Sequence, residues 1–278
     1  MKRILGLIMA AVLFSGVGYA SASTIGGAET SGQGIVAAAF EQEVVFERKM
    51  RQDKAKWTDD ISDLDMKVKP KIEGMNTSLV KISYGLLDNL DIYVKLGAGN
   101  VKTTANLSGI YSGFLEILKG EMKFKSDYGF TYGLGAKGTY NLTSDWFIGC
   151  DIQYLRSEAD YKAKADGSIW NEGEYLPYEA DFNGNSTWQA WQVAPYVALK
   201  AGNFVPYLGI KYSDLIQKYK NKGVSEDGFP LESLTTRSKG NCGIFVGTDY
   251  RIGTNWKLNI EGRFIDETAM SLGANYKF

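Results

Sequence analysis

Apolar and polar residues alternate with a period of two along most of the chain, most clearly between Asn255 and Phe278. Every second position there is apolar or aromatic: Trp256, Leu258, Ile260 and Phe264, then Met270, Leu272, Ala274, Tyr276 and Phe278. A period of two places successive side chains on opposite faces of a strand. This stretch therefore predicts two strands, each with one apolar and one polar face.

The same alternation recurs in eight earlier segments, so the sequence predicts about ten strands in all. These segments cover residues 35–47, 75–84, 91–98, 128–140, 146–161, 191–199, 206–212 and 242–251. Short turns alternate with long polar connections, which cover residues 48–74, 102–126, 162–184 and 220–239. A soluble β-sandwich has no reason to produce this alternation, and it would need a second sheet to cover each apolar face.

The predicted fold is therefore all-β, a transmembrane antiparallel up-and-down β-barrel with short periplasmic turns and long extracellular loops. An open sheet edge would leave unpaired backbone groups in lipid. We therefore expect the last strand to pair with both its predecessor and the first strand.

The first 22 residues have a different pattern. Lys2 and Arg3 precede an apolar run over residues 4–14, and Ala20-Ser21-Ala22 supplies the small residues of a cleavage site. This order is typical of a secretory signal peptide, and the run is too short to span a membrane. We expect cleavage after residue 22, a flexible glycine-rich lead-in over 23–34, and a barrel domain over 35–278.

Two sequence runs resemble small bacterial outer-membrane β-barrel proteins of the opacity and porin-like superfamily. The run SYGLLDNLDIYVKLGAG is similar to their tight periplasmic hairpins, and LGANYKF is similar to their C-terminal aromatic signal. The resemblance implies a surface antigen in the outer membrane of a Gram-negative bacterium, in contact with the lipid bilayer and lipopolysaccharide. It also implies that Tyr276 and Phe278 present the last strand to the barrel-assembly machinery. These motifs belong to a fold and not to an activity.

The charged residues between the apolar positions would face the lumen of such a barrel. Six acids then face nine bases: Glu41, Glu43, Asp91, Asp151, Asp249 and Glu261 against Lys81, Lys95, Lys137, Lys200, Lys211, Arg251, Lys257, Arg263 and Lys277. Unpaired ions in a confined lumen are costly, so we expect networks near mid-height that involve Arg263, Glu261, Lys211 and Asp151. As lumen-lining residues of a pore we select Lys95, Asp151, Lys211, Arg251, Lys257, Glu261 and Arg263.

Cys150 and Cys242 fall among outward apolar positions of two strands that are not sequence neighbours, so we expect two free thiols and no disulfide. The chain carries 31 basic and 32 acidic residues and no basic block, which gives no indication of nucleic-acid binding. The acidic run at Asp59, Asp60, Asp63 and Asp65 does not match an EF-hand loop, and we expect no metal or other cofactor.

The chain contains no histidine. Known barrel enzymes of the outer membrane, such as the omptin proteases, the outer-membrane phospholipase and the lipid A-modifying barrels, use a histidine as general base or as part of a triad. Those mechanisms have no base here, so we do not expect an enzyme.

Three other functions remain. Inward charges on nearly every strand favour a narrow, porin-like channel with a weak anion preference that follows the basic excess. The long connections, with aromatic residues such as Trp57, Trp170 and Phe229, favour a surface-exposed adhesin or receptor. A purely structural barrel is the third possibility. The sequence favours the channel, and it does not identify the solute, the partner or the oligomeric state.

Overall fold

The computed structural model describes residues 24–57, 64–111, 116–171, 174–222 and 231–278. The chain forms one antiparallel sheet. The strands are β1 (Val36–Trp57), β2 (Leu64–Leu87), β3 (Leu90–Tyr111), β4 (Glu116–Ser126), β5 (Gly129–Asn141), β6 (Trp146–Asn171), β7 (Glu174–Leu199), β8 (Phe204–Asn221), β9 (Leu231–Ser238), β10 (Cys242–Ile252), β11 (Trp256–Phe264) and β12 (Glu267–Lys277). Among the described residues, no helix is long and apolar enough to cross a membrane.

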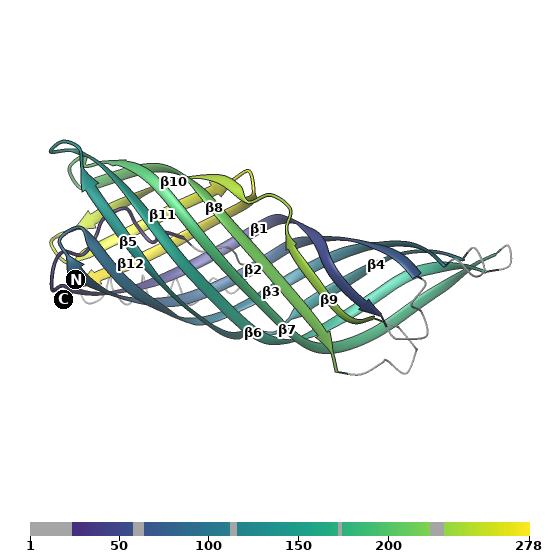
Figure 1. Ribbon diagram of the computed structural model, residues 1–278. Coiled ribbons are helices and arrows are strands. Elements are labelled where there is room, and N and C mark those ends of the chain that lie inside the picture. Colours follow the sequence, from purple (N-terminus) through teal and green to yellow (C-terminus); the bar gives the residue numbers. More distant parts are fainter. Residues whose placement is uncertain (1–23, 58–63, 112–115, 172–173, 223–230) are drawn as a thin grey trace.

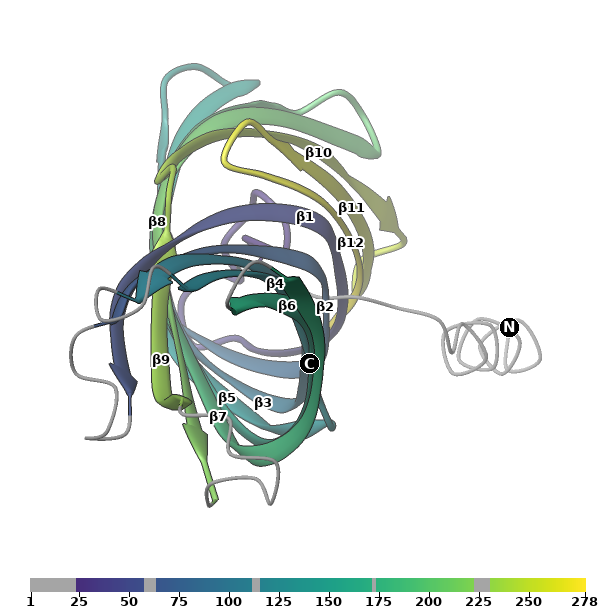
Figure 2. The same ribbon diagram turned by 90° about the vertical axis from the view of Figure 1, so that its right-hand side faces the viewer.

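The sheet closes into a barrel (Figures 1 and 2). β12 pairs with β11 on one side and with β1 on the other, so the expected closure by the last strand is confirmed. β4 and β5 pair with the same two neighbours, β3 and β6, and continue each other across a break at Asp127 and Tyr128. β9 and β10 continue each other in the same way beside β8. The predicted ten-stranded antiparallel barrel is confirmed.

The barrel has two levels along its axis. At the end with the short turns, β1 pairs with β12, up to the pair Arg48 and Glu267. Beyond that pair the β11–β12 hairpin ends, and β1 pairs directly with β9, from Met50 and Ser238 onward. In Figure 1, β11 and β12 accordingly lie at one end of the barrel, and β4 and β9 lie at the other. We call these levels the ten-stranded half and the eight-stranded half.

The outer face changes character between the two halves. In the ten-stranded half it is an apolar belt of exposed side chains: Val80, Leu96, Phe130, Leu134, Ile152, Leu208, Ile210, Val246 and Leu272, among others. Exposed aromatic residues lie beside the short turns, among them Tyr84, Tyr140, Trp146 and Tyr250. In the eight-stranded half the outward side chains are mostly charged or polar, for example Lys49, Lys69, Lys123, Lys164 and Lys218. Lipid favours the first kind of surface and water the second.

The long connections expected from the sequence are largely strands. β6 and β7 have 26 residues each and remain paired from Trp146 and Leu199 to Asn171 and Glu174. The strands continue because the alternation persists with inverted chemistry: in β4, buried Met122 and Phe124 alternate with exposed Lys123 and Lys125. The barrel wall therefore extends beyond the apolar belt as a sheet.

Two buried clusters occupy the interior of the eight-stranded half and the middle of the barrel. The first contains Val68, Leu107, Met122, Phe124, Tyr161, Phe182, Tyr219, Leu231 and Leu234, with several alanines. The second contains Met50, Ile72, Met75, Leu79, Val101, Leu155, Trp188, Ala190 and Leu215. The inward side chains thus form a hydrophobic core at these levels.

Cys150 and Cys242 are both unbonded, as expected. Cys150 is half-buried on β6, and Cys242 is exposed on β10.

Candidate functional site

The interior of the ten-stranded half contains a dense group of buried charges, which begins at mid-height around the tip of the β11–β12 hairpin. Ile265 adopts a left-handed backbone conformation with φ of 84° at this tip. The next two residues, Asp266 and Glu267, lie in the lumen and are both buried. A side chain at Gly243 would collide with the Asp266 carboxylate, since an added Cβ would lie 1.9 Å from its Oδ1. The hairpin therefore ends by inserting two carboxylates into the barrel.

Three cations bind these two carboxylates. Arg48 lies 3.0 Å from Glu267 and 3.5 Å from Asp266. Lys211 pairs with both, at 3.1 Å from Asp266. Arg263 connects this group to the next, at 3.1 Å from Glu267, 2.7 Å from Glu43 and 3.6 Å from Glu261. Burial makes such pairs costly to break from one side.

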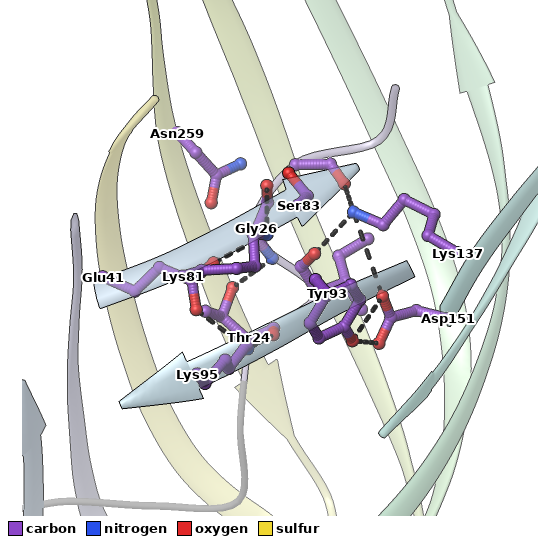
Figure 3. A network of polar contacts seen from close by, with 12 residues as sticks. Thr24, Gly26, Glu41, Lys81, Ser83, Tyr93, Lys95, Lys137, Asp151 and Asn259 are labelled. Atoms are coloured by element: carbon purple, nitrogen blue, oxygen red, sulfur yellow. Dashed lines mark hydrogen bonds and ion pairs between the residues drawn. The ribbon is translucent and has the colours of Figure 1, made fainter. Parts of the chain in front are cut away.

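A second network lies closer to the short turns (Figure 3). The Glu41 carboxylate lies 2.8 Å from Lys81 and 2.8 Å from Lys95. Lys257 pairs with Asp249 at 3.1 Å. Lys137 lies 4.0 Å from Asp151, so this contact is the longest of the group.

Inward tyrosines position several of these carboxylates. The Tyr93 hydroxyl donates to Asp151 at 2.9 Å, and the Tyr207 hydroxyl donates to Glu261 at 3.1 Å. Each ring covers a glycine directly opposite on the neighbouring strand: Tyr93 covers Gly135, Tyr207 covers Gly247, and Tyr196 covers Gly149. An added Cβ at these glycines would lie 2.3–2.4 Å from a ring carbon, so the rings require glycine there.

Residues 24–34, which the sequence predicts as part of a flexible lead-in, run through the barrel from buried Thr24 to the short-turn end, where Gln33 and Gly34 are exposed. We call them the N-terminal segment. Four lysines donate to its carbonyl oxygens: Lys81 to Gly26 (3.4 Å), Lys95 to Thr24 (3.0 Å), Lys137 to Ile25 (2.5 Å) and Gly27, and Lys277 to Thr30 (3.1 Å) and Ser31 (3.2 Å). Four carboxylates accept from its backbone amides: Glu43 from Thr24, Asp249 from Ala28 (3.0 Å), Asp91 from Ser31 (2.8 Å) and Asp88 from Gln33 (3.3 Å). The segment is thus held mainly by its backbone.

Side chains of the segment add apolar and ionic contacts. Ile25 and Ala28 are fully buried against an aromatic cluster that includes Phe147, Tyr196 and Phe245. Glu29 pairs with Arg251 near the short-turn end. A cavity between the segment and the barrel, lined in part by Lys81, Asp91, Tyr93 and Lys277, has a volume of about 10 Å³, room for about one water molecule. The segment therefore occupies most of the space in this part of the lumen.

In the eight-stranded half, the described side chains form no comparable ionic lining. Phe124 packs against the rings of Tyr161, Phe182 and Tyr219, with centroids 4.4–5.8 Å apart. Burial raises the pKa of Tyr161 and of Tyr219, so both hydroxyls stay protonated at neutral pH. Tyr161 donates its proton to the Asn221 side chain. The apolar core thus closes the lumen above the ions.

The residues selected as lumen-lining from the sequence fall into two groups in the structure. Lys95, Asp151, Lys211, Lys257, Glu261 and Arg263 are buried inside the barrel. Arg251 lies at the rim, with 34% of its side chain exposed. Arg263 contacts Glu261, and Lys211 joins the same network through Glu267, whereas Asp151 lies in the second network with Lys137. Their role in a pore remains a prediction.

Sequence reasoning missed four lumen charges: Glu29, Arg48, Asp266 and Glu267. Three of these four are acidic. Lys200, which was expected in the lumen, lies instead at the short-turn end with its ammonium 3.1 Å from the Asn141 amide oxygen. Nine acids then face nine bases, and the expected basic excess in the lumen disappears. The only sequence signal for Asp266 and Glu267 was that they interrupt the alternation.

The expected assembly signal lies at the end of β12. The centroid of the Tyr276 ring lies 4.9 Å from that of Trp256 and 5.0 Å from that of Phe278. The Phe278 side chain is exposed. Within the described residues, no group of three or more cysteine or carboxylate side chains is placed to hold a metal. Asp59, Asp60, Asp63 and Phe229 lie outside the described residues, as do the side chains of Trp57, Asp65 and Trp170.

No family model and no curated protein sequence matches the chain. Solved structures match its fold. The outer membrane protease OmpT from Escherichia coli is 12% identical, with a TM-score of 0.54 over 88% of this chain and 97% of OmpT. An outer membrane channel from Pseudomonas putida F1 is 9% identical (TM-score 0.38; 93% and 100% covered). The attachment invasion locus protein Ail of Yersinia pestis is 10% identical (TM-score 0.29; 88% and 99% covered). The likeness to OmpT shows the fold of an outer-membrane β-barrel, and no activity follows from it.

Proposed function

Starting from this fold, we propose that the protein is a resident outer-membrane barrel that acts at the cell surface through its eight-stranded half. One observation supports this most: in the described residues the lumen is occupied at each level, by the N-terminal segment and buried ions below and by an apolar core above. A water-filled pore needs a continuous polar path, and an apolar core interrupts such a path. The ten-stranded half then anchors the protein in the membrane, and the eight-stranded half, which extends beyond the membrane, binds partners at the cell surface; we call this part the extension.

The dimensions support the same proposal. A 26-residue strand at about 3.3 Å per residue and a tilt of about 45° gives a barrel roughly 60 Å tall, against an apolar band of about 25 Å. The eight-stranded half therefore rises well beyond the membrane. An adhesin or receptor presents its binding surface in this way, and a structural barrel gains nothing from the extra length.

Labelling of intact cells tests the orientation. We replace Cys150 and Cys242 with alanine and introduce either Lys123→Cys in the eight-stranded half or Asn203→Cys in a short turn, since both positions are exposed. A membrane-impermeant maleimide should label the Lys123→Cys variant in intact cells and the Asn203→Cys variant only after lysis. The reverse pattern would place the extension in the periplasm and contradict a surface role.

A narrow channel is the second candidate, favoured by the charged lumen at membrane level. Planar-bilayer recordings of the refolded protein, with a porin refolded alongside as the positive control, distinguish the two. We expect no conductance steps from this protein. Steps that disappear in the double variant Arg263→Ala, Lys211→Ala would support the channel. The anion preference expected from the sequence loses its basis, because Glu29, Asp266 and Glu267 offset the basic excess.

The same proposal extends to the partners. The apolar belt would contact the lipid bilayer, and β12, with Tyr276 and Phe278, would contact the barrel-assembly machinery. Lys102, Lys125 and Lys162 are direct cross-strand neighbours on the outer face just beyond the belt. Like charges directly opposite each other are destabilising unless an anion lies between them, and lipopolysaccharide phosphates supply such anions. No catalytic role is proposed, since the chain lacks the histidine that known outer-membrane barrel enzymes use.

A further inference from the structure

The N-terminal segment is bound in the lumen as a peptide is bound by a receptor. The barrel contacts its backbone with charged side chains from strands that are far apart in the sequence: Lys95 on β3, Lys137 on β5, Asp249 on β10 and Lys277 on β12. Hydrogen bonds to charged groups are about twice as strong as neutral ones. The lumen thus presents cations to the carbonyl groups and carboxylates to the amide groups of one continuous stretch of backbone.

The closure of the barrel does not require this segment. The ring of strand pairs is complete through β1–β12 and β1–β2, and these pairs begin only at Val36 and Ala37. Backbone bonds between the segment region and the barrel are few, for example Gly34 to the Gly85 carbonyl at 2.8 Å. A segment outside the ladder can leave while the ladder stays intact.

Most of the buried ions around the segment also have partners within the barrel. Glu41 pairs with Lys81 and Lys95, Asp249 with Lys257, and Glu43 with Arg263. The ammonium of Lys137 depends more on the segment, because its carboxylate partner lies 4.0 Å away, and among the described residues the side chains of Lys277 and Asp91 bind only the segment. Removal of the segment therefore leaves a largely paired, polar vestibule that water can enter.

The site selects its ligand by shape at two glycines. Gly26 and Gly27 have φ of 63° and 98°, a conformation that residues with a side chain rarely adopt. A Cβ on Gly26 would lie 2.1 Å from the Glu41 carboxylate, and a Cβ on Gly27 would lie 2.7 Å from that of Asp249. A matched peptide with alanine at both positions therefore provides a specific control.

We propose that the short-turn end of the lumen is a peptide-binding site whose ligand is the chain's own residues 24–33, bound as a separable unit and replaceable by the same peptide supplied in solution. The ligand class is a short glycine-rich peptide with two consecutive glycines in the left-handed conformation. This inference does not depend on the proposed surface role, since it concerns the opposite end of the barrel.

The test uses the chain without the expected leader, residues 23–278, with a specific protease site inserted between Gln33 and Gly34, which are both exposed. The protein is refolded first and then cut, so that folding occurs with the segment attached. A fluorescent peptide of the sequence TIGGAETSGQ is added, and its anisotropy reports binding. We expect saturable binding at one peptide per barrel, and at least about 100-fold weaker binding of the peptide with alanine at both glycines.

Three results would overturn the proposal: no binding of the native peptide, equal binding of both peptides, or loss of the heat-modifiable barrel on cutting. The third would mean that the segment is an integral part of the fold.

A second measurement uses the uncut chain with Cys150→Ala, Cys242→Ala and Ser83→Cys, because Ser83 is buried beside the segment. Adding Gly26→Ala and Gly27→Ala should raise the rate of maleimide labelling at residue 83 by at least about tenfold. An unchanged rate would contradict a displaceable segment.

Discussion

The two halves of this barrel share six long strands, β1, β2, β3, β6, β7 and β8, but have opposite polarity. In the ten-stranded half the outer face is apolar and the lumen contains the buried ion pairs. In the eight-stranded half the outer face carries lysines and the interior is an apolar core. The surroundings, and not the sheet, therefore decide which face of the barrel wall is apolar. Lipid outside requires an apolar outer face, and water outside requires a polar outer face over an apolar interior.

The largest expected effect comes from the ions of the ten-stranded half. Arg263→Ala leaves Glu43, Glu261 and Glu267 without their shared cation, and should lower the free energy of unfolding by about 5 kcal/mol. Urea unfolding in lipid vesicles, followed by tryptophan fluorescence, measures this loss. Arg251→Ala at the rim is the matched control and should cost at most about 1 kcal/mol. Equal losses of unfolding free energy in the two variants would mean that the buried network stabilises the barrel no more than the ion pair at the rim.

The next effect tests the core of the eight-stranded half. Phe124 is fully buried among three aromatic rings, so Phe124→Ala should cost about 3–4 kcal/mol in the same assay. Lys123→Ala, one residue away on the outer face, should leave unfolding unchanged. A mild effect of the Phe124 change would indicate that this half is not packed as a core.

The outer faces can be compared with one substitution type. Leu134→Arg places a charge in the apolar belt and should cost about 2–3 kcal/mol. Asn106→Arg places the same charge on the exposed outer face of the eight-stranded half and should cost nothing measurable. If both variants lose stability equally in vesicles, the boundary between the halves does not coincide with the membrane surface.

The smallest expected effect is a gain in stability, whereas the main variants above lose stability. Lys125 lies between Lys102 and Lys162, so Lys125→Ser removes two like-charge contacts and should stabilise the detergent-solubilised protein by about 0.2–0.5 kcal/mol. Added lipopolysaccharide should then stabilise the native protein more than the variant. The same response of both proteins to lipopolysaccharide would contradict a phosphate contact at this row.

Much of the ten-stranded half could be predicted from the sequence, because lipid demands uninterrupted alternation on the outer face. The run from Ile92 to Ala98 and the terminal run to Phe278 needed no other information. The extension was harder to predict, because bulges between Val45 and Glu47 and between Ile72 and Gly74 shift the parity of β1 and β2. The signal was present in β4, where Met122 and Phe124 alternate with lysines, but charged outward positions resemble a loop.

The interior of the barrel was the least predictable part. The alternation of strand residues between the lumen and the outer face identified Arg263 and Glu261. Asp266 and Glu267 follow a turn, where residues do not alternate between two faces. The N-terminal segment has no local signal at all, since glycine-rich sequence is typical of turns and linkers. Its partners, such as Asp249 and Lys277, lie more than two hundred residues away, and only the closed barrel brings them together.

The N-terminal segment runs down the lumen with its first described residue deepest. Thr24 lies beside Glu43 and Lys95 in the interior, whereas Gln33 lies at the short-turn end beside Asp88. The backbone amide of Thr24 therefore lies within a packed interior. If the leader is removed after Ala22, as the sequence predicts, that proteolytic step has to precede entry of the segment. Maturation would then have a fixed order, and an affinity tag fused at the new amino terminus would keep the segment out of the barrel.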